Sequence, residues 1–537
     1  MQHYYLGIDV GTGSARAGVF DRAGTMLASA KRDIALFREA GHVVEQSSND
    51  IWQAVCASVR EAVKVSGAAP ESVKGIGFDA TCSLVVLGEG GRPLGVGPSG
   101  DDERNIIVWM DHRATEQARR INETGHAVLN YVGGTISPEM ETPKLLWLAE
   151  NKPDIFAQAW QFMDLADFLT WRASGSLSRS VCTVTCKWTY LAHEARWDES
   201  YFRLIGLGAL ADEKFRRIGT EVVPAGTPLG KGLTAQAARD LGLGEGTPVA
   251  AGLIDAHAGG LGTVGARGGA GSLLSRMAYV FGTSACTMTS TREPTFVKGV
   301  WGPYNSAMVP GLWLNEGGQS AAGAAIDHLV RHHPAAAQAA AAAEAAGISL
   351  SQWLSLEADK RGGAAATPDL VGQLHVVPEF LGNRAPFADP DALGIIAGIG
   401  MDTGLDSLIG LYLAGMCGLG YGARQIVEVQ RESGIAIDTM VVSGGAGQSA
   451  LSRQLLADTT GLAVAASTSQ EPVMLGSAML GAVAAGAFPD IETAMAAMAE
   501  LGAVHQPSAA SRQWHQRRFR AFELLQKAGQ AVRSAAE

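Results

Sequence analysis

Charged residues are scarce in this chain, and the basic ones do not gather into runs. Only 18% of the 537 residues are Asp, Glu, Lys or Arg, and 42 basic against 53 acidic side chains give a net charge of −11. The densest basic cluster, Arg517-Arg518-Phe519-Arg520, has the pattern of one exposed helix face. Because nucleic acids and anionic membranes are bound through dense positive charge, we expect no nucleic-acid or membrane partner.

Cysteine and long apolar runs are also rare. Six cysteines in so long a chain do not make a disulfide scaffold. Cys182 and Cys186 are spaced C-x3-C, but no second pair follows, which disfavours a zinc site. No uncharged apolar run reaches the roughly 18 residues of a membrane span, and a strand pattern begins directly after the first residues, which leaves no space for a signal peptide. We therefore expect a soluble, cytoplasmic protein in a reducing compartment.

Glycine, in contrast, is abundant. The chain has 67 glycines, and 47% of its residues are apolar, which is enough for large cores and excludes a disordered chain. The glycines have no three-residue period and only 20 prolines accompany them, which excludes a collagen-like chain. Glycine is used where the backbone turns tightly or approaches a ligand closely, so its excess points to such places.

Strand-like runs alternate with helical patterns, as is typical of an α/β protein. We expect strands at 4–10, 73–78, 248–254, 277–281, 374–377 and 439–443, helices at 51–64, 406–429 and 450–456, and a peripheral alanine-rich helix at 335–346. Length alone suggests three or four domains. However, residues 5–15 and 279–285 both have an apolar strand followed by Gly-Thr and small polar residues. This internal repeat predicts two halves of similar architecture, with a boundary near 255–275.

The first glycine turn is suited to a phosphate group. Gly11 and Gly13 allow backbone N–H groups to face an anion, and the hydroxyls of Thr12 and Ser14 add donors. Asp9, at the end of the preceding strand, is suited to hold Mg²⁺. An ordinary hairpin turn is the alternative, and a hairpin whose tip binds phosphate combines both interpretations.

Two further glycine turns have related chemistry. Gly282-Thr283-Ser284 offers the same donors without the acid, so the two turns together would make a phosphate clamp. Residues 445–450 fit G-x-G-x-x-A, but the acid that a dinucleotide site needs about 20 residues later is missing. Another mode of nucleotide binding, in which the glycines of this turn lie against the base and ribose, fits the sequence better than a dinucleotide site does. A Walker A motif is absent, because 226–232 has the wrong spacing and no Ser or Thr at its end.

Asp255 and several polar residues are candidates for the remaining chemistry. Asp255 follows a strand and precedes a helix, where it would serve either as a helix cap or as the acceptor of a hydroxyl proton in phosphoryl transfer. The residues alone do not decide between these two roles of Asp255. Polar groups suited to a polyol occur at 81–83, 109–113, Lys187 and 316–320. Each alone is more typical of a surface or cap residue, and His112 and His257 are more often structural.

As an ordered set, the segments 7–16, 109–114, 252–257, 281–284 and 443–449 resemble the FGGY family of carbohydrate kinases, over residues 4–490. The resemblance implies an α/β fold of two ribonuclease-H-like (actin-like ATPase) domains that flank a catalytic cleft. It implies a sugar-binding domain at 1–262, an ATP-binding domain at 263–500 and a helical tail at 501–537. It also implies ATP and Mg²⁺ as cofactors and makes Asp255 the expected catalytic base.

Within the family, the chain is most similar to the ribulokinase-type pentulose kinases. This rests on Thr81-Cys82-Ser83-Leu84, on Lys187 and on Glu316, whereas residues 109–113 differ from the Trp-Gln-Asp-x-Arg form of glycerol kinases. The resemblance gives three sets of site residues. Substrate would be bound by Thr81, Ser83, Asp111, His112, Lys187, Asp255 and Glu316; ATP by Gly11, Thr12, Ser14, Arg16, Gly282, Thr283, Ser284, Gly444, Gly445 and Gln448; and the metal by Asp9.

The expected activity is ATP-dependent phosphorylation of the terminal hydroxyl of a pentulose, with D-ribulose as the first candidate. L-ribulose, ribitol and other pentuloses or pentitols remain alternatives. Three other classes stay open at this point: an actin-like ATPase switch without a sugar, a nicotinamide-dependent dehydrogenase built on residues 445–450, and a sugar sensor without catalysis. The expected partners are small molecules, and a homodimer is left open.

Overall fold

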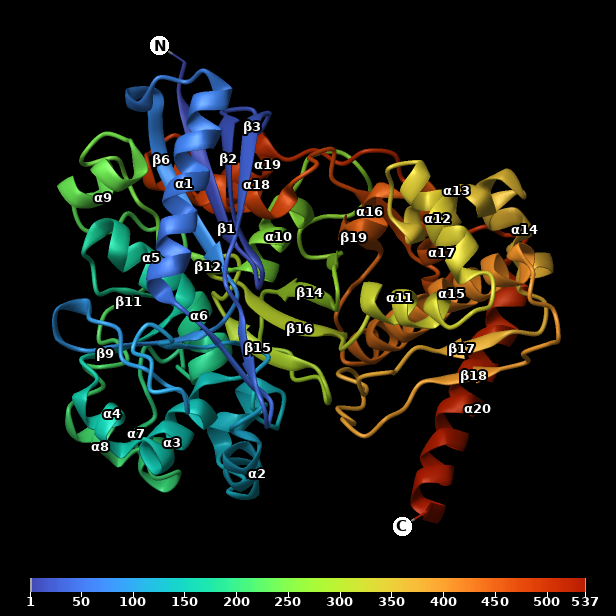
Figure 1. Ribbon diagram of the computed structural model, residues 1–537, viewed down its shortest axis with the longest axis horizontal. Coiled ribbons are helices and arrows are strands. Elements are labelled where there is room, and N and C mark those ends of the chain that lie inside the picture. The colour runs from blue at the N-terminus through green and yellow to red at the C-terminus, as the bar shows by residue number, and fades with distance from the viewer. Residues whose placement is uncertain (1, 537) are drawn as a thin grey trace.

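Two mixed β-sheets that share the same arrangement of five strands form the centres of the two bodies of the molecule, and the second sheet has β15 as an additional edge strand (Figure 1). The computed structural model describes residues 2–536. The first sheet has the order β12-β6-β1-β2-β3, and the second has the order β15-β16-β14-β13-β19-β20. In each, a hairpin (β1-β2 or β13-β14) has a third antiparallel strand on one side and two parallel strands on the other. The repeated order confirms the α/β class and the two similar halves.

The strands have the following bounds. The first sheet consists of β1 (Tyr4–Val10), β2 (Ser14–Asp21), β3 (Met26–Asp33), β6 (Val73–Ala80) and β12 (Leu253–Ile254). The second consists of β13 (Arg276–Phe281), β14 (Ala285–Thr291), β15 (Trp301–Asn305), β16 (Trp313–Gln319), β19 (Thr439–Gly444) and β20 (Ala463–Ala466). Smaller sheets are made by β4 (Phe37–Glu39), β5 (Val43–Gln46), β8 (Ile106–Ile107), β7 (Leu84–Leu87) and β9 (Gln161–Asp164), by β10 (Arg179–Ser180) with β11 (Val222–Val223), and by β17 (His375–Val377) with β18 (Ile395–Ala397).

The helices divide along the chain in the same way. The first half contains α1 (Ser48–Ser66), α2 (Thr115–Glu123), α3 (Glu141–Asn151), α4 (Pro153–Gln158), α5 (Leu165–Ser174), α6 (Val181–Trp188), α7 (Glu199–Leu204), α8 (Gly208–Asp212), α9 (Ala235–Leu241) and α10 (Asp255–Val264). The second contains α11 (Gly323–Arg331), α12 (Ala336–Ala345), α13 (Leu350–Lys360), α14 (Gly363–Val371), α15 (Leu405–Glu432), α16 (Gly445–Gln448), α17 (Ala450–Thr460), α18 (Pro472–Ala484), α19 (Ile491–Met498) and α20 (Arg512–Ala536). None of the helices within residues 2–536 is long and apolar enough to span a bilayer.

Most expected elements are present, and one strand prediction is wrong. Residues 248–254 do not form one continuous strand: Val249 makes an isolated bridge to β6, and regular pairing returns only at Leu253 and Ile254. Between them the amide of Ala251 donates to the carbonyl of Thr227, 2.8 Å away, instead of to β6. The apolar run at 248–254 correctly predicts that nearly all of these residues are buried. The break in strand pairing arises because Ala251 donates to Thr227, in a distant loop, and the apolar pattern does not predict this contact.

Glycine brings helix α18 into backbone contact with the first sheet, although α18 comes from the far end of the chain. A Cβ atom on Gly77 of β6 would lie 1.9 Å from the carbonyl oxygen of Ser477, and one on Gly7 of β1 would lie 1.8 Å from that of Met474. On its other side α18 contacts α10, where a Cβ on Gly476 would lie 2.0 Å from the carbonyl oxygen of Ala258. Part of the glycine excess thus serves close packing between the two halves.

Candidate active site

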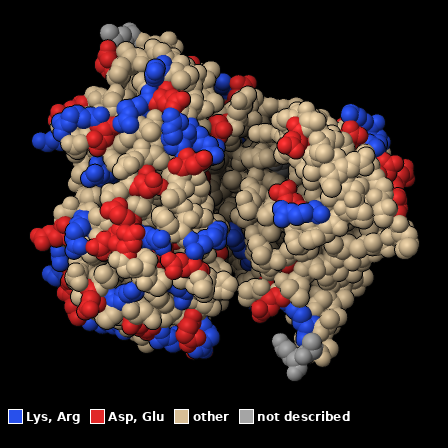
Figure 2. All heavy atoms as spheres, viewed as in Figure 1, with Lys and Arg blue, Asp and Glu red and all other residues tan. Residues whose placement is uncertain are grey.

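Three carboxylates meet where neighbouring parallel strands of the first sheet end. Asp9 of β1 is the register partner of Asp79 of β6, and Ile254 of β12 pairs with Ala80, so Asp255 follows directly at the same edge. The carboxyl ends of adjacent parallel strands are where α/β proteins place their ligands. On the face shown in Figure 2, a hollow separates the two bodies of the molecule. Asp9 and Asp255 were predicted site residues; Asp79 was not.

The environment of each acid differs. The Arg16 guanidinium donates to Asp9, and it also donates to Glu471, 2.8 Å away. The Ser477 hydroxyl donates to one oxygen of Asp79 at 2.5 Å, and the other oxygen has no partner among the described residues. Burial and the nearby charge of Asp9 raise the pKa of Asp79 well above its ordinary value. A buried carboxyl oxygen without a partner is a position where a bound group is expected.

Asp255 is the first residue of α10 and does not cap it. The cap position is Ile254, which provides no side-chain hydrogen bond, and the Asp255 carboxylate accepts only from the amide of the next residue, at 2.7 Å. Burial and the charge of Asp9 raise the pKa of Asp255 to about 6, against the opposing effect of Lys187. Asp255 is thus a partly exposed carboxylate that does not cap α10, and its raised pKa suits it to accept a proton.

The hard oxygen ligands that Mg²⁺ prefers are present at this edge. Asp9 is 2% exposed, and the unpartnered oxygen of Asp79 belongs to the adjacent strand. These donors fit a divalent cation held by carboxylates. Asp9 is therefore suited to the role that the sequence predicts for it, with Asp79 beside it.

Lys187 and Glu316 come from different halves and face each other. Lys187 lies on α6 and Glu316 on β16; the Nζ–Oε2 distance is 3.9 Å, and Nζ lies 4.8 Å from the centre of the Trp301 ring. Burial opposes the charge on Lys187, but the neighbouring Glu316 holds its pKa well above the ordinary value. The two predicted substrate residues thus form one charged pair. The Trp301 ring beside Lys187 is an aromatic neighbour that the sequence analysis did not identify.

The predicted loop residues of the sugar site are linked to the first glycine turn. The hydroxyls of Thr81 and Ser83 are 3.3 Å apart, and Ser83 accepts from the Trp109 amide at 3.1 Å. The Trp109 indole donates to the hydroxyl of Thr12 at 2.9 Å. Because this hydroxyl accepts from Trp109, its own proton remains available for a ligand.

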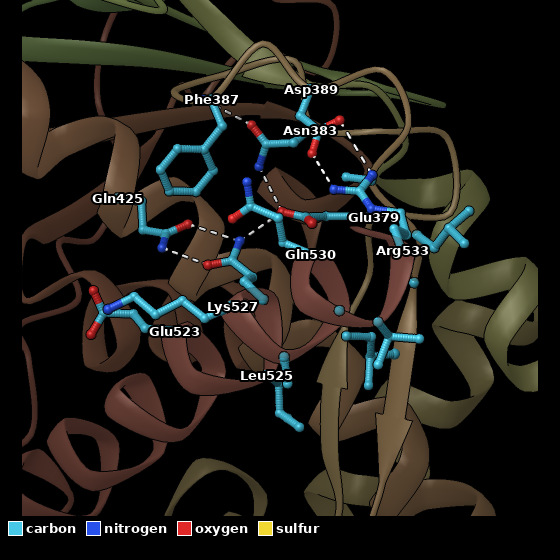
Figure 3. Close-up of a pocket in the computed structure, with 18 residues that line it drawn as sticks. Glu379, Asn383, Phe387, Asp389, Gln425, Glu523, Leu525, Lys527, Gln530 and Arg533 are labelled. Carbon is cyan, nitrogen blue, oxygen red and sulfur yellow. Dashed lines mark hydrogen bonds and ion pairs between the residues drawn. The ribbon is translucent and has the colours of Figure 1, made fainter. Parts of the chain in front are cut away.

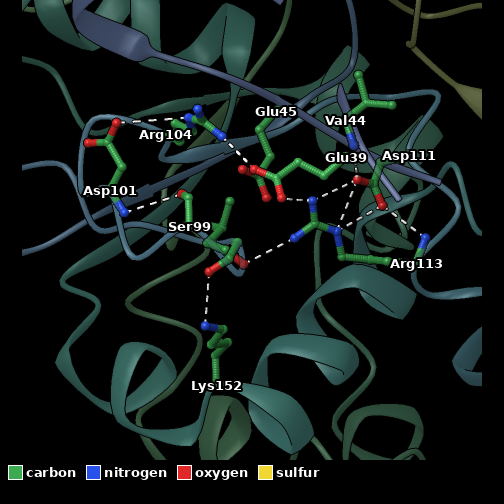
Figure 4. A network of polar contacts seen from close by, with 11 residues as sticks. Glu39, Val44, Glu45, Ser99, Asp101, Arg104, Asp111, Arg113 and Lys152 are labelled. Carbon is green, nitrogen blue, oxygen red and sulfur yellow. Dashed lines mark hydrogen bonds and ion pairs between the residues drawn. The ribbon is translucent and has the colours of Figure 1, made fainter. Parts of the chain in front are cut away.

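Asp111 and His112 lie side by side in the sequence but in different surroundings. Asp111 is fully buried and accepts from the Arg113 guanidinium, at 2.7 Å for the closest contact, and from the Val44 amide at 2.6 Å (Figure 4). It therefore fixes the loop, and a direct contact with a ligand stays a prediction. His112 is 47% exposed and lies 3.5 Å from Glu139, a hydrogen bond that raises the pKa of this histidine.

The predicted nucleotide residues fall on the tips of two hairpins and on one adjoining strand end. The Gly11 amide donates to the Ser14 carbonyl at 3.0 Å, and the Gly282 amide to the Ser284 carbonyl at 2.8 Å, so each turn is closed by its first glycine, but the second turn is one residue shorter. Gly444 ends β19 beside Phe281, and a Cβ there would lie 2.1 Å from the Phe281 carbonyl oxygen. Gly445 and Gln448, in α16, are exposed nearby. The second and third turns are therefore neighbours across two parallel strands.

Comparison with known proteins identifies the family. The N-terminal domain model of the FGGY family of carbohydrate kinases matches residues 4–262, and the C-terminal domain model matches residues 277–485. The chain belongs to the FGGY family of carbohydrate kinases. It is therefore a carbohydrate kinase, which overturns the dehydrogenase, ATPase-switch and sensor alternatives.

Relatives and solved structures agree with this assignment. The chain is 45% identical to a human FGGY carbohydrate kinase domain-containing protein, over 98% of this chain and 96% of the relative. It is 39% identical to a D-ribulokinase of Saccharomyces cerevisiae, over 90% of this chain and 72% of the relative. A xylulose kinase of Lactobacillus acidophilus has the same fold, with a TM-score of 0.80 at 18% identity and full coverage of both chains.

Some residues of the cleft carried no recognisable signal in the sequence. Asp79 lies in an apolar strand, and only the register of β1 and β6 places it beside Asp9. Arg384, from the second half, lies 3.9 Å from Glu139 of the first half and stacks over Trp301. The position of Asp79 follows from this register, and the contacts of Arg384 depend on the docking of the two halves.

Proposed function

We propose that this kinase transfers the γ-phosphoryl group of ATP to the terminal hydroxyl of a pentulose, most readily D-ribulose. The observation that carries the proposal is the buried Lys187–Glu316 pair beside Asp255, since it offers a cation, an acceptor and a base within one cleft. The identity to a yeast D-ribulokinase supports the choice of sugar. L-ribulose, ribitol and other pentuloses or pentitols are the alternatives.

Asp255 is the proposed base. With a pKa of about 6 it is mostly ionised at neutral pH and still basic enough to accept the proton of a sugar hydroxyl. Lys187 and Glu316, together with Thr81, Ser83, His112 and Asp111, bind and orient the sugar in this proposal. Their directional hydrogen bonds would hold the attacking oxygen in line, which supplies much of the catalysis in phosphoryl transfer.

ATP is proposed to lie across the glycine turns. Gly11, Thr12, Ser14 and Arg16 contact the phosphates from one side, and Gly282, Thr283 and Ser284 from the other; Gly444, Gly445 and Gln448 lie against the adenosine. Asp9 holds Mg²⁺ in this proposal, and the ion, when bound, neutralises charge on the phosphates. The two hairpin tips, each closed by its first glycine and at least partly exposed, support this placement.

The organisation of the chain is part of the proposal. We infer a sugar-binding domain at 1–262, an ATP-binding domain at 263–500 and a helical tail at 501–537. Helix α18 belongs to the second of these by sequence but packs on the sheet of the first, so it would couple the two during closure. We also infer a cytoplasmic location, which the free thiols of all six cysteines support, because disulfides are rare in reducing compartments.

We also propose a homodimer formed through the C-terminal helix. Beside α20 a cavity of about 740 Å³ is lined by both polar and apolar residues, and the apolar side chains of Phe387, Leu393 and Val532 are more than half exposed (Figure 3). A twofold axis that brings the grooves of two copies together would bury these exposed apolar side chains.

The deciding experiment is a panel of pentuloses and pentitols in a coupled ADP-release assay. We expect D-ribulose to give the highest kcat/KM. A hexose or glycerol preferred over every pentulose and pentitol would contradict the proposal. D-ribulose exceeded by L-ribulose or ribitol would contradict only the choice of sugar.

A further inference from the structure

Three soft metal ligands meet behind the cleft. The sulfur atoms of Cys182 and Cys186, one turn apart on α6, and a ring nitrogen of His257 on α10 all lie within 4.8 Å of one another. All three side chains are buried, and Cys186 Sγ lies 3.6 Å from His257 Nε2. The C-x3-C spacing has no second pair in the sequence, but the fold brings its third ligand from 71 positions away.

A fourth ligand is aimed at the same place. Glu316 is 4% exposed, and its Oε2 atom has no hydrogen-bond partner among the described residues. This oxygen lies 3.9 Å from His257 Nε2. In a tetrahedral zinc site, metal–ligand bonds of about 2.0–2.3 Å place neighbouring ligand atoms roughly 3.3–3.8 Å apart. The two distances to His257 are close to this range before any metal is bound.

We propose that Cys182, Cys186, His257 and Glu316 form a binding site for Zn²⁺. Binding would break two S–H bonds, release both protons to solvent and form two zinc–thiolate bonds. The ammonium of Lys187, 3.9 Å from Glu316, would offset the one negative charge by which two thiolates and a carboxylate exceed the ion. The Ile254 amide already donates to Cys182 Sγ at 3.5 Å, a contact of the kind that supports metal-bound thiolates. Thiolate ligands select zinc over Mg²⁺, so the site is distinct in chemistry from Asp9.

Occupation of this site would inhibit the kinase. Glu316 can serve either zinc or the sugar, and an ion bound to Glu316 would also weaken its pairing with Lys187. This consequence rests on the proposed sugar site: zinc and the pentulose should compete, and the pentulose should protect the enzyme.

The direct test uses Co²⁺ as a spectroscopic substitute on the full-length, reduced protein after treatment with a chelator. We expect one equivalent of cobalt to give thiolate-to-cobalt charge-transfer absorption and the strong visible bands of a tetrahedral ion, both reversed by Zn²⁺. The bands should be lost in C186S and in C182S and kept in C56S, which removes a buried thiol of α1. Circular dichroism checks that each variant is folded, and H257Q provides an independent variant of the third ligand. Absent bands, or bands unchanged in C186S and H257Q, would overturn the site.

A second readout separates the site from the sugar chemistry. Micromolar Zn²⁺ should inhibit ADP release at least tenfold at low pentulose concentration, and C186S should be insensitive while C56S stays sensitive. If the cobalt bands are present but a higher pentulose concentration does not relieve the inhibition by Zn²⁺, the proposed competition between zinc and the pentulose is wrong. Cobalt bands in an enzyme that phosphorylates no pentulose would uphold the metal site and reject the proposed function.

Discussion

Asp79 stands directly opposite Asp9, at the ends of two parallel strands, and the two carboxyl groups share one charged environment. Ser477 of α18 donates to Asp79, so a helix from the second half of the chain supports an acid of the first sheet. Arg16 balances Asp9 from the neighbouring strand. Burial favours the protonated form of Asp79, so a neutral carboxyl group lies beside Asp9, the proposed metal ligand, and Ser477 links it to the contact between the halves.

Replacing Asp79 by Asn should alter the requirement for Mg²⁺ while the fold is kept. Because burial already favours the protonated, neutral form of Asp79, an amide of the same shape can accept from Ser477. We expect the Mg²⁺ concentration for half-maximal activity to rise several-fold in D79N and far more in D9N. Titration of activity with Mg²⁺ measures this. Unchanged Mg²⁺ dependence in D79N would remove Asp79 from the metal environment.

Asp255→Asn should abolish turnover without preventing ATP binding. General-base catalysis contributes about 10²–10⁴-fold, so kcat should fall by at least that factor while the affinity for a fluorescent ATP analogue stays within about twofold. D154N, on an exposed surface of α4, is the matched control and should retain full activity. Activity of D255N near that of D154N would reject Asp255 as the base.

The pH dependence of the reaction should report Asp255. The ionised form is the active one, so kcat/KM for the pentulose should be constant above pH 7 and fall about tenfold per unit below the pKa of about 6. The measurement is made at saturating MgATP, so that titration of the nucleotide does not dominate. The residual activity of D255N should not show this fall in kcat/KM below pH 6.

Protein stability should change with pH in the opposite sense. The pKa of Asp255 is raised in the folded state from 3.8 to about 6, so the folded state binds a proton more tightly than the unfolded chain does. Between about pH 4 and 6 this group therefore contributes stability that is lost as the pH rises. At pH 7.5, D255N should melt at a higher temperature than the wild type, and at pH 4 the difference should shrink. An equal difference at both pH values would contradict the raised pKa.

Gly77→Ala should destabilise the protein strongly. The added methyl group would lie 1.9 Å from a backbone oxygen of α18, which cannot move as a side chain can. Overpacking costs about 1–3 kcal/mol and sometimes more, so we expect a clear fall in the melting temperature by differential scanning fluorimetry. G400A is the control, because nothing lies within 4 Å of its Cβ position. Equal stability of the two variants would argue against close packing of α18 on the sheet.

The C-terminal groove should hold the dimer together. V532E and L393E place a charge on its exposed apolar wall, where an isolated subunit loses little stability. Both should shift the mass measured by light scattering from twice to once that of the chain, while V65E, at an equally exposed site on α1, should not. A wild-type protein that is monomeric at micromolar concentration would reject the dimer.

The sequence determined the class of fold and most of the chemistry by itself. Apolar runs that end in glycine turns are local patterns, and they predicted β1, β13, β19 and the repeated halves, as well as Asp9 and Asp255 as candidates. The spacing of the glycine turns and the resemblance that they carry were enough to indicate a carbohydrate kinase, because each motif is contiguous in the chain.

Only the tertiary structure decided which distant residues meet. The pairing of Asp79 with Asp9 follows from strand register, and the break within 248–254 follows from a loop hydrogen bond. The pair Lys187–Glu316 depends on how the two halves pack, and the cluster of Cys182, Cys186 and His257 depends on how α6 and α10 pack within the first half. Propensity and periodicity act over a few residues, whereas the contacts Asp9–Asp79, Lys187–Glu316 and Cys186–His257 join residues 70 or more positions apart.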